Sequence, residues 1–177
     1  MTIPMVLTFI GDDRPGLVNA ISETVAALGG TWLESRLAHL AGKFAGIVLV
    51  SVSEAQVDSL EAALRALDAR GLRVSVERGA GAPEPARAKT LKLEIVGNER
   101  PGIVRDVTQA LIALGVNIEE FTSGIESAPF SGMQMFRASA KLGIPDGLSD
   151  DTLRKTLERL AGEIMVDLAV KDAGSPL

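Results

Sequence analysis

The chain has 177 residues, of which 46% are hydrophobic and 23% charged, and its formal net charge is −5. This balance allows a real hydrophobic core and argues against a disordered chain. The negative charge disfavours direct binding to nucleic acid or to an anionic membrane. There is no cysteine, which excludes disulfides, thiolate metal sites and cysteine nucleophiles. The length allows one ordinary domain or two small ones.

The first nine residues lack the basic region, the apolar stretch and the small-residue cleavage site of a signal peptide. No apolar run in the sequence approaches the roughly 18 residues that a membrane span needs. The absence of cysteine also fits a reducing compartment. We therefore expect a cytoplasmic protein without membrane contact.

The sequence contains an internal repeat with an offset of 86 positions. Residues 11–18 (GDDRPGLV) return as residues 97–104 (GNERPGIV). Three separate motifs share this one offset, which indicates a duplicated domain. The other two motifs are Ala-Leu-Gly at 27–29 and 113–115, and Phe-x-Gly at 44–46 and 130–132.

A stretch rich in glycine, alanine and proline separates the two copies. Such a composition does not fill a core and is typical of a linker. We predict a first domain at residues 1–80, a linker at 81–88, a second domain at 89–172 and a C-terminal tail at 173–177.

Each copy opens with a strand and a helix. Apolar residues occupy every second position of residues 5–9, which predicts a strand. They then recur at helical spacing from Leu17 to Leu28, and Gly29 predicts the end of that helix. The second copy repeats the three signals at residues 91–95, 103–114 and 115.

A hairpin, a second helix and a last strand complete each copy. In the first copy these are predicted at 31–40, 43–53, 57–67 and 72–76. In the second copy they are predicted at 117–126, 131–141, 153–160 and 164–168, and the acidic start Ser149-Asp150-Asp151 suits a helix N-terminus. The predicted fold class is α+β: two ferredoxin-like βαββαβ domains in tandem, each with an antiparallel sheet and both helices on one face.

The repeated Arg-Pro-Gly turn joins the first strand of each copy to the first helix. Proline is tolerated in the opening turn of a helix, and we expect Asp13 to cap the first one. Gly16 and Gly102 leave the backbone uncovered, so that free N–H groups and the helix dipole could receive a carboxylate. The turn is either such an amino-acid cradle or simply a tight helix start. Its recurrence at one offset favours the cradle.

The motifs [DE]-R-P-G-[IL]-V, Leu-Gly-x-[NT] and Phe-x-Gly in a βαββαβ frame resemble the ACT domain. Two such domains, covering residues from about 3 to 170, resemble the glycine cleavage system transcriptional repressor family. Residues 127–136 and the Gly143-Ile144-Pro145 turn are similar to that family in particular.

The resemblance implies that a small amino acid, glycine first, binds between the turn and a neighbouring ACT unit. It also implies regulation through a DNA-binding activator, without contact with DNA, and a homo-oligomer formed through the ACT domains.

Carried over by position, the implied ligand-binding residues lie in the two turns and at the start of one strand. Asn117 begins that strand in the second copy, where its side-chain amide could face a ligand. The first copy has Thr31-Trp32 where the family has Asn-Ile, so the second copy is the stronger candidate. The candidate ligand-binding residues are Asp12, Asp13, Gly16, Leu17, Asn98, Glu99, Gly102, Ile103 and Asn117.

No catalytic residues, metal site or cofactor are predicted. His39 is the sole histidine, which excludes a histidine metal cluster, and its strand position favours an ordinary role. Trp32 is interpreted as a core residue and not as a ring that stacks on a ligand. Met133 and Met135 share one strand face and are interpreted as packing residues.

The sequence bears on four classes of function. We expect an amino-acid-sensing regulator and not an enzyme, since no nucleophile with its base, no metal set and no phosphate loop is present. The alternative is a non-sensing ACT protein–protein interaction module whose units associate through exposed sheet edges. An RNA-recognition domain shares the element order, but the chain has 3% aromatic residues and no tyrosine, too few for base stacking.

Overall fold

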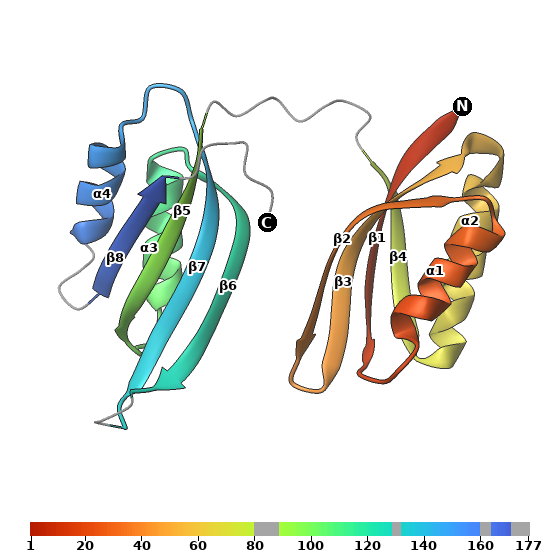
Figure 1. The fold of residues 1–177 in the computed structure, drawn as a ribbon, viewed down its shortest axis with the longest axis horizontal. Coiled ribbons are helices and arrows are strands. Elements are labelled where there is room, and N and C mark those ends of the chain that lie inside the picture. Colours follow the sequence, from red (N-terminus) through yellow and green to blue (C-terminus); the bar gives the residue numbers. More distant parts are fainter. Residues whose placement is uncertain (80–88, 129–131, 160–163, 171–177) are drawn as a thin grey trace. The chain divides into compact units, whose positions relative to one another are not determined.

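The computed structural model describes residues 1–79, 89–128 and 132–159, together with the backbone of residues 164–170. By its internal contacts the chain divides into two compact units, Met1–Glu84 and Pro85–Leu177 (Figure 1). The predicted linker, the predicted tail and Phe130 lie outside the described residues. Each unit is described by itself.

The first unit has the predicted βαββαβ order. Its sheet is fully antiparallel, with strand order β2-β3-β1-β4, and both helices cover one face of it (Figure 1). The elements are β1 (Thr2–Asp12), α1 (Leu17–Ala27), β2 (Thr31–Leu40), β3 (Lys43–Ser53), the 3₁₀ turn η1 (Glu54–Gln56), α2 (Val57–Arg65), the 3₁₀ turn η2 (Ala66–Arg70) and β4 (Leu72–Arg78).

The second unit repeats this arrangement element by element. Its antiparallel strand order is β6-β7-β5-β8, which matches the first unit position by position. The elements are β5 (Lys89–Asn98), α3 (Ile103–Ala113), β6 (Asn117–Ser127), β7 (Gln134–Ile144), α4 (Asp150–Glu158) and β8 (Ile164–Val170). The predicted fold class is therefore confirmed.

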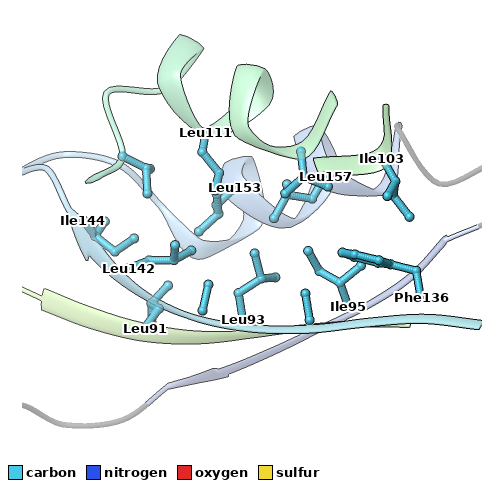
Figure 2. Close-up of a cluster of buried hydrophobic side chains, with 14 residues drawn as sticks. Leu91, Leu93, Ile95, Ile103, Leu111, Phe136, Leu142, Ile144, Leu153 and Leu157 are labelled. Carbon is cyan, nitrogen blue, oxygen red and sulfur yellow. The ribbon is translucent and has the colours of Figure 1, made fainter. Parts of the chain in front are cut away.

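Each core lies between the sheet and its two helices. In the second unit, Leu93 and Ile95 project from β5 towards Leu111 of α3 and Leu153 of α4 (Figure 2). These side chains are almost fully buried, because alternate strand residues and one helix stripe face each other. In the first unit Trp32 is half-buried and packs against the core, as interpreted from the sequence.

The predicted glycine ends of the first helix in each unit and the predicted start signal of α4 agree with the structure. Gly29 and Gly115 follow α1 and α3 with φ of 67° each, the left-handed conformation in which glycine ends helices. Ser149 caps α4, because its hydroxyl accepts a hydrogen bond from the Thr152 N–H at 3.2 Å.

One predicted turn is wrong. Gly143 and Ile144 continue β7, and Gly143 pairs with both Thr90 and Asn117. Ile144 is buried, so the strand extends to place it in the core. The turn begins at Pro145, whose carbonyl accepts the Leu148 N–H at 3.3 Å.

Candidate ligand-binding site

Both copies of the turn place a left-handed glycine directly before a helix. Gly16 precedes α1 with φ of 93°, and Gly102 precedes α3 with φ of 88°. Other residues are strained in this region of backbone conformation. Among the described residues, no side chain caps either helix start. The amides of these first turns are thus left without a side-chain acceptor.

The prediction that Asp13 caps α1 is wrong. Asp13 lies three residues before Gly16, and its N–H donates to the Gly42 carbonyl at 2.9 Å. Its carboxylate instead lies 3.6 Å from the Nε2 atom of His39. Asp12 also points to this side, where it pairs with Lys43. A hydrogen bond from Lys43, followed by its charge, lowers the pKa of Asp12.

The four candidates of the first copy therefore separate into two pairs. Asp12 and Asp13 contact the residues of the β2–β3 hairpin. Gly16 and Leu17 line a groove next to η2. The Leu17 side chain is buried in the core, so its backbone and not its side chain is available to a ligand.

The groove has a volume of about 170 Å³ and lies between the start of α1 and the end of η2. Arg14 crosses this junction and donates a hydrogen bond to the Arg70 carbonyl. Within the described part of the chain, neither Arg14 nor Arg70 forms an ion pair with a carboxylate. The lining residues are Arg14, Pro15, Gly16, Leu17, Asn19, Ala20, Glu23, Leu67, Arg70 and Leu72.

Arg14 belongs to the repeated motif but is not among the residues predicted for the site. Its signal was the arginine shared by both copies of the turn. Neither Arg70 nor Glu23 belongs to a motif of the sequence. Arg70 lies 56 positions from Arg14, so only the fold brings the two together.

The second copy of the turn holds a carboxylate of its own. The Oδ2 atom of Asp106 lies 2.8 Å from Nη1 of Arg100, and its Oδ1 atom lies 2.9 Å from Nη2 of Arg105. Hydrogen bonds from Arg100 first and Arg105 second lower the pKa of Asp106. The Asp106 side chain is 20% exposed, so this cluster closes over the start of α3.

Arg105 also covers Gly102. Its Nη2 atom lies 3.1 Å from the position that a side-chain carbon on Gly102 would occupy. In the first copy nothing lies within 4 Å of the same position on Gly16. The two helix starts therefore have the same backbone conformation, but only the first is open to a ligand at its glycine.

Asn117 lies far from the turn of its own unit. It begins β6 opposite Gly143 of β7, whereas Asn98, next to the turn, lies opposite Met135. Eight positions of β7 separate these partners, which is about 27 Å at the rise of roughly 3.4 Å per strand residue. A site that combines Asn117 with such a turn needs the turn of another ACT unit.

The remaining second-copy candidates are placed by the backbone. Glu99 donates its N–H to the Gln134 carbonyl at 3.0 Å, and Ile103 has its side chain in the core. The ligand-binding roles of all nine candidate residues stay predictions. In the residues that the structure describes, no three His, Asp or Glu side chains gather to hold a metal ion, and no helix there is long and apolar enough to cross a membrane.

Residues 4–77 match the ACT domain family model. A phosphoserine phosphatase of Mycobacterium tuberculosis is 30% identical over 181 aligned positions, 97% of this chain and 41% of the phosphatase. The glycine cleavage system transcriptional repressor of Escherichia coli is 30% identical over 125 residues, 70% of this chain and 66% of the repressor. The chain thus spans less than two thirds of the length of either relative.

Two crystal structures share the whole architecture. A protein of unknown function from Galdieria sulphuraria has a TM-score of 0.85 at 28% identity, covering 97% of this chain and 100% of that one. A protein provisionally named a glycine cleavage system transcriptional repressor has a TM-score of 0.72 at 19% identity, covering 97% and 99%, which supports the fold alone. Residues 4–77 therefore belong to the ACT domain family, the second unit repeats the same fold, and the sequence resembles the glycine cleavage system transcriptional repressors.

Proposed function

We propose that this protein binds a small amino acid in the groove at the start of α1 and transmits its occupancy to a protein partner. The observation that carries the proposal is Arg14, which lies beside a helix start without a side-chain cap and, among the described residues, forms no ion-pair contact with a carboxylate. A guanidinium and a helix N-terminus both favour a carboxylate. Glu23 lines the same groove and offers an acceptor for an ammonium group.

The volume of the groove, about 170 Å³, suits a small amino acid better than a large one. Glycine is the first candidate, because the name of the Escherichia coli relative links it to the glycine cleavage system. On this reading the protein represses glycine cleavage genes through a DNA-binding activator in the cytoplasm. The net charge of −5 favours a protein partner over DNA.

Calorimetric titration of the purified chain with glycine, serine, alanine and larger amino acids tests the sensor. Arg14→Gln should weaken binding of glycine by about tenfold or more, since it removes a charge-assisted hydrogen bond. Arg65→Gln is the matched control, because Arg65 pairs with Glu61 on the α2 surface and loses the same charge. Absence of heat with every amino acid contradicts the proposal.

The implied role of Asn117 has its own test. Asn117→Ala should weaken binding if its amide reaches a ligand held by another ACT unit. Thr31→Ala, at the equivalent strand start of the first unit, is the comparison variant. Equal affinity in wild type and in Asn117→Ala removes Asn117 from the site.

We also propose that the chain does not catalyse a reaction. The relative from Mycobacterium tuberculosis is named as a phosphatase, but this chain covers 41% of its length. The described residues are accounted for by two ACT-like units. Release of phosphate from phosphoserine by the purified chain overturns this part of the proposal.

A second candidate function is a non-sensing interaction module. Strand β2 is an edge of its sheet and exposes Leu33 and Leu40. A second copy of the same edge is the simplest occupant, because an antiparallel edge pairs with itself. Light scattering that shows a dimer, with activator binding indifferent to every amino acid, favours this reading over the sensor.

A further inference from the structure

The two repeats differ by one carboxylate at the same place. At the offset of 86 positions, Arg14 corresponds to Arg100 and Ala20 corresponds to Asp106. In the second unit that arginine holds the Asp106 carboxylate at 2.8 Å. In the first unit Ala20 offers nothing to hold, and Arg14 donates to a backbone carbonyl.

We propose that Asp106 is a built-in substitute for a ligand's carboxylate, which keeps the second repeat permanently occupied and confines the amino-acid response to the first repeat. This inference rests on the proposed function above. The class of ligand follows from the substitution: the second repeat shows that this turn positions its arginine for a carboxylate, so the groove of the first repeat takes an α-amino acid through its carboxylate.

Among the described residues of the second repeat, both arginines at the helix start are already paired with a carboxylate. Arg100 and Arg105 both bind Asp106, and the Arg105 guanidinium covers Gly102. A ligand carboxylate would have to displace an aspartate tethered to the same helix. The tether gives Asp106 a high effective concentration, so a free amino acid competes poorly.

The first repeat lacks all three components of that closure. The first repeat has Asn19 at the position of Arg105 and Ala20 at the position of Asp106, and nothing covers Gly16. Gly16, Asn19 and Ala20 all line the groove. The groove is therefore the counterpart of the volume that the Asp106 cluster fills.

Exchanging the residues at these two positions tests the inference. The variants are Ala20→Asp, the neutral control Ala20→Asn, and Asp106→Ala, and the measurement is the number and affinity of glycine and serine molecules bound per full-length chain by calorimetry. Wild type should bind one. Ala20→Asp should lose at least tenfold in affinity, whereas Ala20→Asn should keep most of it. Circular dichroism and Trp32 fluorescence check that each variant is folded.

If Ala20→Asp does not fold, Asp106→Ala still tests the inference. This variant removes the carboxylate that substitutes for the ligand, and it should raise the number of amino acids bound per chain from one to two. Two molecules bound to wild type, or full affinity in a folded Ala20→Asp variant, overturns the inference and leaves the proposed function standing. If wild type binds none, the sensor function fails. In that case binding gained by Asp106→Ala still supports the substitute, and no gain overturns it as well.

Discussion

Replacing Gly16 with alanine isolates the cost of the backbone conformation that opens the groove. Gly16 has φ of 93°, and nothing lies within 4 Å of the position of an added side-chain carbon. The substitution therefore creates no clash, and its cost is the left-handed conformation alone. That conformation costs an L-residue about 1 to 2 kcal/mol, so the first unit should lose stability by this amount.

Urea denaturation followed by tryptophan fluorescence measures the loss. Trp32 is the sole tryptophan of the chain and packs against the core of the first unit, so its emission reports on that unit. With a denaturant slope of about 1 kcal/mol per molar urea for a unit of this size, the midpoint should fall by about 1 to 2 M.

Gly16→Asn is the control that separates strain from bulk. Asparagine tolerates the left-handed region better than alanine does, so the larger residue should destabilise the first unit less. If Gly16→Ala leaves the midpoint unchanged, or if asparagine costs more than alanine, backbone strain is not what selects glycine here.

Three further changes probe the packing, a helix cap and the pH dependence. Leu64→Ala removes a fully buried side chain and should destabilise the first unit by about 2 to 5 kcal/mol, seen in the Trp32 transition. Ser149→Ala deletes the cap of α4 and should cost about 1 kcal/mol, measured by circular dichroism, with Ser149→Asp restoring it. The folded-state pKa of Asp106 is lowered, so its contribution to stability is present above the unfolded value of about 3.9 and is lost as pH falls through the folded pKa. Urea midpoints followed by circular dichroism from pH 6 down to about pH 2.5 should therefore depend less on pH in Asp106→Asn than in wild type. An unchanged pH dependence contradicts the assignment.

The fold could be predicted because the local periodicity of the sequence indicates each helix and strand, and the repeat gives each of these signals twice. Strands β2 and β3 have the predicted bounds, and the glycines after α1 and α3 end those helices. The missed strand end at Ile144 depends on burial in the core. The turn at Gly143-Ile144-Pro145 was expected from the family resemblance, and in the structure it begins only at Pro145.

The site was less predictable, because its residues come together only in three dimensions. The motifs predict the positions of Gly16 and Gly102, but they do not show that the residues of each turn point in different directions. In the structure Asp12 and Asp13 turn to the β2–β3 hairpin, and Arg70 supplies the other wall of the groove. Which carboxylate pairs with which arginine depends on side-chain direction, which spacing alone does not determine.

The proposed asymmetry of the repeats has a consequence for the shape of the response. A repeat whose carboxylate is part of the chain gains no binding energy from a free amino acid, so it adds nothing that depends on ligand concentration. One chain then has one responsive site, and its binding curve should be hyperbolic with a Hill coefficient of about 1. Asp106→Ala, by opening a second site, should make the curve fit two sites. A sigmoidal curve from wild-type chains shown to be monomeric by light scattering would mean that both repeats respond to the ligand, and the division of roles between Ala20 and Asp106 would be wrong.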